Sequence, residues 1–162
     1  MSRIHNFICL LFLVIFISIN ILFVQKEPVY DDLNLKKLLN FIEMKTDTNS
    51  IIQTDFEVYN KYVWISPLIR SISRRAIFID NSYTFNLEDS KEWLIRKGII
   101  KKIKADIKLN KIEKAFCDLK KYNIDYFISS KSIESTFAVN LLVFKNSKFY
   151  VYKIKDHKNK SC

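Results

Sequence analysis

The residues best suited to chemistry gather between Pro67 and Arg96. Four of the five arginines of the chain lie there, and the planar guanidinium group of arginine binds phosphate and carboxylate through two parallel hydrogen bonds. The same window contains carboxylates and a tryptophan. We interpret it as a pocket for an anionic or sugar-phosphate group. Its candidate ligand-binding residues are Arg70, Arg74, Arg75, Asp80, Glu92, Trp93 and Arg96.

Two elements must position these side chains. The apolar run Ala76–Asp80 predicts a buried strand that ends in a carboxylate, and the helix after it carries Glu92 and Trp93. Ligands of open α/β sheets bind beyond the carboxyl ends of the strands, where Asp80 would lie. The alternative interpretation is structural: Arg74 or Arg75 pairs with Asp80 or Glu92, and Trp93 belongs to the core.

Other kinds of site have little support. The three cysteines, Cys9, Cys117 and Cys162, lack the spacing of metal ligands, and their odd number predicts no disulfide framework. The two histidines, His5 and His157, stand near opposite ends of the chain. A single glycine cannot form the glycine-rich loops that hold phosphates in many nucleotide-binding proteins. We therefore expect no metal and no cofactor.

An enzyme is the weakest of three hypotheses. It would be a transferase or hydrolase that uses Asp80 or Glu92 as its base. No nucleophile stands in a recognisable pattern with such a base. We therefore expect no catalytic residues. The second hypothesis is an accessory membrane-anchored domain. The third is a membrane-tethered module that binds an anion through Arg70, Arg74 and Arg75.

Hydrophobic periodicity alternates between helix and strand along the domain. Two of the predicted helices have the same boundary signals: an asparagine begins each helix, and a glycine or asparagine ends it. The predicted helices are Asp32–Lys45, Asn86–Gly98 and Asn110–Asn123, with part of Ile99–Lys108 also helical. The predicted strands are Ser50–Thr54, Ala76–Asp80 and Tyr126–Ser129, followed by a hairpin of Ser135–Phe144 and Lys148–Ile154.

This order predicts the α/β class. The fold is expected to be a two-layer or three-layer α/β domain over residues 26–162, with a mixed sheet whose parallel part ends in an antiparallel hairpin. Strands separated by helices need crossover connections, which the intervening helices provide.

Residues 1–25 are predicted to be a transmembrane anchor. Ile4–Val24 contains no Asp, Glu, Lys or Arg, and a helix of this length spans roughly 30 Å, the thickness of the hydrocarbon core. The run is longer than the apolar core of a signal peptide, and no small-residue cleavage site follows it. A cleaved signal or a buried core helix is the alternative. Counting Arg3 against Lys26, Lys36 and Lys37 mildly favours a cytoplasmic domain, although long domains translocate largely regardless of charge.

The chain is basic, with 27 Lys and Arg against 17 Asp and Glu, and the excess lies in its second half. Most of the basic residues are lysines, which recognise phosphate less specifically than arginines do. Solvated surface lysines are the plain interpretation, and attraction to anionic lipid headgroups is the alternative. We expect no nucleic-acid partner.

The segment Pro67–Asp80, followed by Glu92, Trp93 and Arg96, resembles the C-terminal soluble domain of certain multi-spanning bacterial membrane proteins. Those proteins are similar to GT-C-type glycosyltransferases, which use lipid-linked sugars on the outer face of the membrane. The similarity extends over residues 51–155. It implies an extracytoplasmic domain, and it outweighs the charge count.

The chain departs from that family in having one predicted span and no early loop with the acidic residues on which GT-C catalysis depends. It resembles a separate C-terminal module. We therefore expect a single-pass protein of the cell (inner) membrane, non-catalytic, that is accessory to, or a remnant of, a surface-glycan membrane protein. Its expected partners are the lipid bilayer and a polytopic membrane protein.

Overall fold

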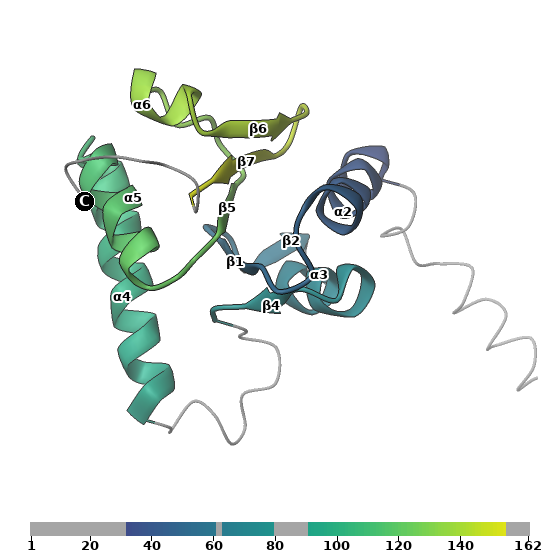
Figure 1. The fold of residues 1–162 in the computed structure, drawn as a ribbon, viewed down its shortest axis with the longest axis horizontal. Helices are drawn as coiled ribbons and strands as arrows, with labels where there is room; N and C mark the ends of the chain where they lie inside the picture. Colours follow the sequence, from purple (N-terminus) through teal and green to yellow (C-terminus); the bar gives the residue numbers. More distant parts are fainter. Residues whose placement is uncertain (1–31, 61–62, 80–90, 155–162) are drawn as a thin grey trace, which may run out of the picture. The chain divides into compact units, whose positions relative to one another are not determined.

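The computed structural model describes residues 32–60, 63–79 and 91–154 (Figure 1). The chain divides into two units, Met1–Asp32 and Leu33–Cys162. The predicted anchor Ile4–Val24 falls in the first unit and outside the described residues. Within the described ranges, no helix combines the length and the apolar character needed to cross a membrane.

The second unit is built on a five-stranded mixed sheet with the strand order β4-β1-β5-β7-β6. Strands β4, β1 and β5 run parallel, whereas β7 is antiparallel to β5 and β6 is antiparallel to β7. A small antiparallel pair, β2 and β3, forms a separate sheet. The strands are β1 (Ile51–Thr54), β2 (Val58–Asn60), β3 (Val63–Trp64), β4 (Ala76–Ile77), β5 (Tyr126–Ser129), β6 (Leu142–Lys145) and β7 (Tyr150–Lys153).

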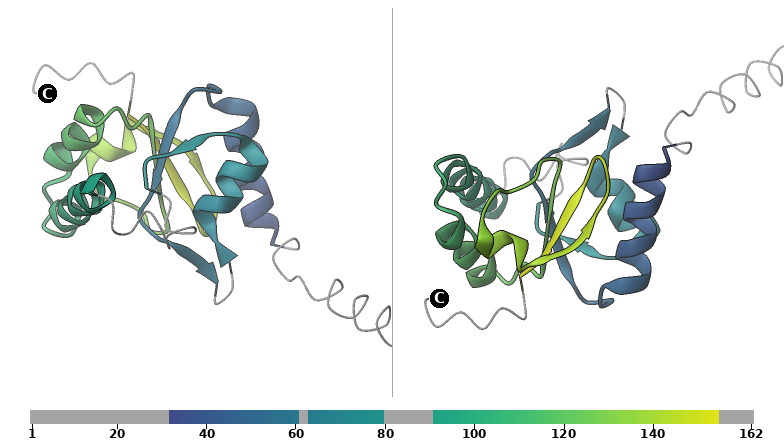
Figure 2. Two further views of the ribbon diagram at one scale, coloured as in Figure 1. Left: turned by 90° about the horizontal axis from the view of Figure 1, so that it is seen from below. Right: turned by 90° about the horizontal axis from the view of Figure 1, so that it is seen from above.

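Helices cover both faces of the main sheet, which makes a three-layer α/β/α arrangement. Helices α2 and α3 lie on one side of the sheet, and α4, α5 and α6 lie on the other (Figure 2). The expected α/β class, with a parallel part and an antiparallel hairpin, is confirmed. The helices are α2 (Leu33–Lys45), α3 (Ile65–Ser73), α4 (Lys91–Lys108), α5 (Ile112–Lys121) and α6 (Thr136–Val139).

The side chains of β5 are buried on both faces of the sheet, because successive side chains of a strand point to opposite faces. Phe127 belongs to the larger core with α4, α5 and α6, where its ring lies 6.2 Å from that of Phe116. Its neighbours Tyr126 and Ile128 are also buried and point toward the face that α2 and α3 cover. A strand buried on both faces reads as a continuous apolar run, which is how the sequence predicted it.

Helices α4 and α5 both end at an asparagine, although Asn110 was predicted to begin a helix and not to end one. Asn110 has a positive φ of 58° and ends α4. The amide of Asn110 donates to Ile107 and that of Lys111 donates to Asp106, which is the Schellman pattern. The same pattern ends α5 at Asn123, as predicted, with the amide of Ile124 donating to Leu119.

Gly98 was predicted to end a helix, and that prediction was wrong. Helix α4 runs through Gly98 to Lys108, and a Cβ at this glycine would meet no described heavy atom within 4 Å. Beyond it, Ile100 and Ile103 are buried and continue the apolar face. Their burial outweighs the cost of about 1 kcal/mol that a glycine imposes on a helix interior.

Two further segments differ from the sequence analysis. The predicted strand Ser135–Phe144 contains the short helix α6, and only its end forms β6, which pairs with β7. Cys117 on α5 is disulfide-bonded, although the cysteine count predicted no disulfide framework. The other two cysteines, Cys9 and Cys162, lie outside the described residues.

Candidate functional site

Arg75 occupies a structural position. Its side chain is 5% exposed, and its guanidinium group donates to the carbonyl oxygens of Glu43 and Thr46 at the end of α2 and to that of Ser73 at the end of α3. A fourth bond, from Nε to the hydroxyl oxygen of Thr46, is 2.9 Å long. Arg75 therefore joins the carboxyl ends of two helices, where a positive charge complements the helix dipoles.

Arg96 is also engaged by the protein. Its guanidinium group forms an ion pair with Glu92 one turn earlier on α4, donates to the carbonyl oxygen of Phe78 at 3.0 Å and stacks over the Phe78 ring. Trp93 is buried, and the amino group of Lys97 lies 4.3 Å from the centre of its ring. The burial of Trp93 agrees with the structural interpretation, whereas Glu92 pairs with Arg96 and not with Arg74 or Arg75.

The remaining predicted residues do not complete a pocket. Arg70 and Arg74 are exposed on and just after α3, and Arg74 ends that helix in the left-handed conformation. Asp80 lies outside the described residues. Two cavities lie at the carboxyl ends of the parallel strands β1 and β5, and none of the six described residues of this prediction lines either of them. Their role in ligand binding stays a prediction.

The carboxyl ends of the parallel strands β1 and β5 carry a different group of polar side chains. The register pairs Thr54 with Ile128, so that Asp55 comes to lie beside Ser129 although the two are 74 residues apart. The carboxylate of Asp55 accepts from the hydroxyl of Ser129 at 2.6 Å and from the amide of Ser130 at 3.1 Å. This is the edge of an open α/β sheet where ligands bind.

Helix α4 brings a line of lysines to the same edge. Lys97, Lys101, Lys104 and Lys108 are spaced by four, three and four residues, which places them on one face of a helix. All four line a cavity of about 390 Å³, together with Gln53 and Thr54 of β1 and with Glu57, Ser66, Ile79, Ile100 and Ala105. The lysine face of α4 thus borders the strand ends.

A second cavity adjoins the first, because Lys104 and Lys108 line both. Its volume is about 520 Å³, and it contains Asp55, Ser129 and Lys131 at the ends of β1 and β5. We call the two cavities together the strand-end site. The remaining residues that line the second cavity are Ile107, Asn110, Ile112, Ser132, Ile133 and Glu134.

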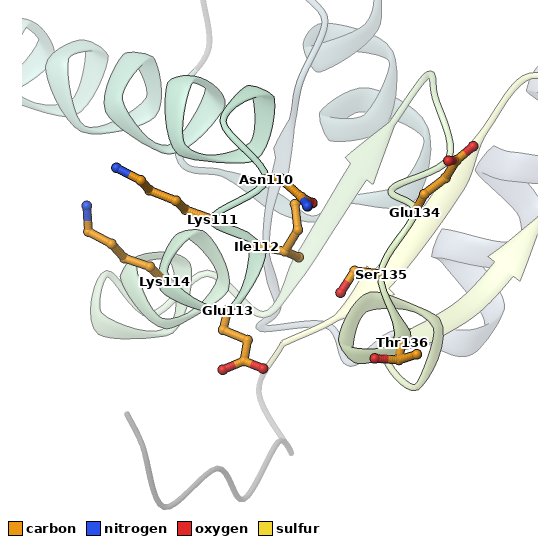
Figure 3. Close-up of a pocket in the computed structure, with 8 residues that line it drawn as sticks. All are labelled: Asn110, Lys111, Ile112, Glu113, Lys114, Glu134, Ser135 and Thr136. Carbon is orange, nitrogen blue, oxygen red and sulfur yellow. The ribbon is translucent and has the colours of Figure 1, made fainter.

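A third cavity, of about 470 Å³, lies between the start of α5 and the segment before α6. Figure 3 shows that its charged side chains do not converge: the amino groups of Lys111 and Lys114 point away from Ser135 and Thr136. Lys114 also forms an ion pair with Asp106 at 3.1 Å. This cavity is a weaker candidate than the strand-end site.

The electrostatics of the strand-end site centre on Asp55. Burial raises the pKa of its carboxyl group above the ordinary value of 3.8, although hydrogen bonds from Ser129 and Ser130 and the positive charges of Lys104 and Lys131 act in the opposite direction. Five lysines line the two cavities against three carboxylates, so that the site has an excess of positive charge. Those carboxylates belong to Asp55, Glu57 and Glu134.

The arrangement suits binding better than nucleophilic chemistry. Ser129 faces a carboxylate but is only 2% exposed, so that its hydroxyl orients Asp55 rather than reaching a substrate. Within the described part of the chain, no group of three or more His, Cys, Asp or Glu residues could hold a metal ion. An oxyanion could meet several lysine amino groups at once.

The comparisons identify no relative. No protein-family model, curated protein or solved structure matches the chain.

Proposed function

We propose that the α/β domain binds a ligand carrying an oxyanion, a phosphate or carboxylate group, at the strand-end site. The observation that carries this proposal is the lysine face of α4, which borders two adjoining cavities at the carboxyl ends of parallel strands. Lys104 and Lys108 are central, because both line both cavities. This proposal moves the anionic ligand from the arginine cluster to the lysines.

Physical chemistry supports this location. Lys104 is partly buried beside Asp55, and an ionic contact there is screened less than one in open solvent. The guanidinium groups of Arg75 and Arg96, in contrast, already donate to carbonyl oxygens of the protein. The lysines of α4 are therefore better placed to receive a ligand.

Removing charge from α4 should weaken oxyanion binding. We expect the full-length double variant Lys104→Gln/Lys108→Gln in non-ionic detergent to bind sulfate about tenfold more weakly, a loss of about 1.4 kcal/mol. Binding is measured as the rise in unfolding temperature on adding sulfate, with chloride at equal ionic strength as reference.

The matched control is Lys37→Gln/Lys45→Gln. Both lysines are exposed on α2, on the other side of the sheet, and the control loses the same net charge. It should bind sulfate within about twofold of the wild type, because distant surface charges are screened by salt. Equal loss in both variants would mean that net charge and not the strand-end site attracts the anion.

We further propose that Ile4–Val24 anchors this domain in the cell membrane with the domain on the extracytoplasmic side. The apolar run supports the anchor. The disulfide bond of Cys117 supports the side, because disulfides persist in oxidising compartments and are rare in the cytosol. By its resemblance, we propose a non-catalytic accessory role beside a polytopic membrane protein of surface-glycan assembly.

The state of Cys117 gives a direct test of the compartment. When cells are lysed in an alkylating reagent without reductant, the peptide that contains Cys117 should stay unmodified, and it should be alkylated only after reduction. Mass spectrometry of the digest measures this, and the variants Cys9→Ser and Cys162→Ser identify the partner cysteine. Complete alkylation of Cys117 before reduction would contradict the extracytoplasmic proposal.

A further inference from the structure

The hydroxyl group of Ser129 has more acceptors around it than it has protons. Its oxygen lies 2.6 Å from Oδ2 of Asp55 and 2.7 Å from the carbonyl oxygen of Lys131. It also accepts a hydrogen bond from the amide of Lys131 at 3.1 Å. A serine hydroxyl has one proton to donate, so it can satisfy only one of the two oxygens.

The second proton has one available source. The carbonyl oxygen of Lys131 belongs to an amide and carries no proton, so only the carboxyl group of Asp55 can supply it. With Asp55 neutral, its O–H donates to Ser129, and Ser129 donates to Lys131. With Asp55 ionised, two oxygens remain in close contact without a proton between them, which is costly at a buried position.

The charged groups around Asp55 come from three elements. Lys104 of α4 faces it, and Lys108 lines the same cavity; Lys131 and Glu134 approach from the segment after β5. Tyr152 of β7 interacts with Asp55 electrostatically, and burial raises the pKa of its phenol. An anion that enters this cavity gains from the lysines and is repelled by an ionised Asp55.

We propose that the strand-end site binds its oxyanion with Asp55 in the neutral form, which is the form that the hydrogen bonds of the ligand-free structure fit. At a pH where Asp55 is ionised in the free protein, binding therefore takes up a proton from solution at this carboxyl group and weakens as the pH rises. The proposal rests on the proposed function of the same site. The proton goes to Oδ2 of Asp55, which then donates to Ser129 while the lysines hold the anion. Asp55 thereby makes the site responsive to pH.

The test measures sulfate affinity of the full-length protein in non-ionic detergent between about pH 5 and about pH 8, where sulfate stays a dianion. We expect the wild type to lose affinity as the pH rises, with a slope approaching tenfold per pH unit where binding takes up close to one proton. In Asp55→Asn the amide reproduces the neutral carboxyl group, since its NH₂ donates to Ser129 and its oxygen accepts from Ser130. Its affinity should be independent of Asp55 titration and should exceed that of the wild type at high pH.

A second measurement needs no variant. At about pH 8, adding sodium sulfate of the same pH to weakly buffered wild-type protein should raise the pH, and adding sodium chloride at equal ionic strength should not. Identical pH profiles for the wild type and Asp55→Asn, or sulfate binding without proton uptake, would overturn the proposal and leave the proposed function intact. A wild type that binds no sulfate at all would overturn both.

Discussion

Replacing Arg75 with methionine is expected to lower the free energy of unfolding by about 3 kcal/mol or more. The side chain is buried, and its four hydrogen bonds end on groups of α2, α3 and the residue after α2. Methionine has a similar length and no charge, so the main loss is electrostatic. Three carbonyl oxygens and a hydroxyl would then lack their donor at buried or half-buried positions.

The size of this effect follows from the asymmetry of buried hydrogen bonds. A bond to a charged group contributes about 1.5–3 kcal/mol, and an acceptor left unpaired costs its desolvation. Water that enters beside the partly buried carbonyl of Glu43 would recover some of the loss. The guanidinium charge also complements the carboxyl ends of two helices, which contributes further.

The measurement is urea-induced unfolding in non-ionic detergent, followed by tryptophan fluorescence. The neighbouring variant Arg74→Met is the control, because Arg74 is exposed and its loss should change the unfolding free energy by less than about 0.5 kcal/mol. Arg75→Lys should lie between the two, since lysine keeps the charge but not the fork of donors. If Arg75→Met is as stable as Arg74→Met, the proposed connection between α2 and α3 does not stabilise the fold.

Arg75 also illustrates what sequence patterns cannot predict. An arginine beside a strand is compatible with a ligand, an ion pair or a helix end. Its partners Glu43 and Thr46 lie about thirty residues earlier in the chain, and no local spacing indicates that α2 ends beside α3. The choice among these roles depends on tertiary packing, which periodicity does not contain.

Local elements were predicted where the pattern and the packing agree. The helix Asp32–Lys45 was found within one residue because its apolar stripe is the face that is buried. The role of Asn110 was predicted wrongly because asparagine is common at both ends of a helix. The role of Gly98 was predicted wrongly because the buried residues beyond it keep the chain helical. The turn chemistry was right for Asn123, where the stripe also ends.

Only part of the strand-end site could be predicted from the sequence. The lysines of α4 have a helical spacing that is visible in the sequence, and counting that spacing would have found them. The pairing of Asp55 with Ser129 was not readable, because it arises from the parallel register of β1 and β5 across 74 residues. Without the pairing of β1 with β5, the sequence does not indicate that Asp55 and Ser129 belong to one site.

Replacing Phe116 with alanine is expected to destabilise the domain by about 3–5 kcal/mol. The ring is 2% exposed and lies in the core between the sheet and the second helix layer. Edge-to-face contacts join it to Phe127 of β5 at 6.2 Å, to Phe137 of α6 at 5.9 Å and to Tyr152 of β7 at 5.6 Å. Phe116 thus contacts all three of these aromatic neighbours.

The loss has two parts. Removing the ring forfeits its transfer from water and leaves a cavity that the sheet cannot collapse into, and each lost aromatic contact adds about 0.5–1.5 kcal/mol. Phe116→Leu loses the same aromatic contacts but fills most of that volume, so it should be less destabilised than Phe116→Ala, and the difference between the two variants measures the lost apolar transfer and the cavity. Urea unfolding of both variants provides the comparison. Equal stability of Phe116→Ala and Phe116→Leu would show that the cavity contributes nothing, and a Phe116→Leu variant as stable as the wild type would show that the aromatic contacts do not stabilise the packing of α5 and α6 on the sheet.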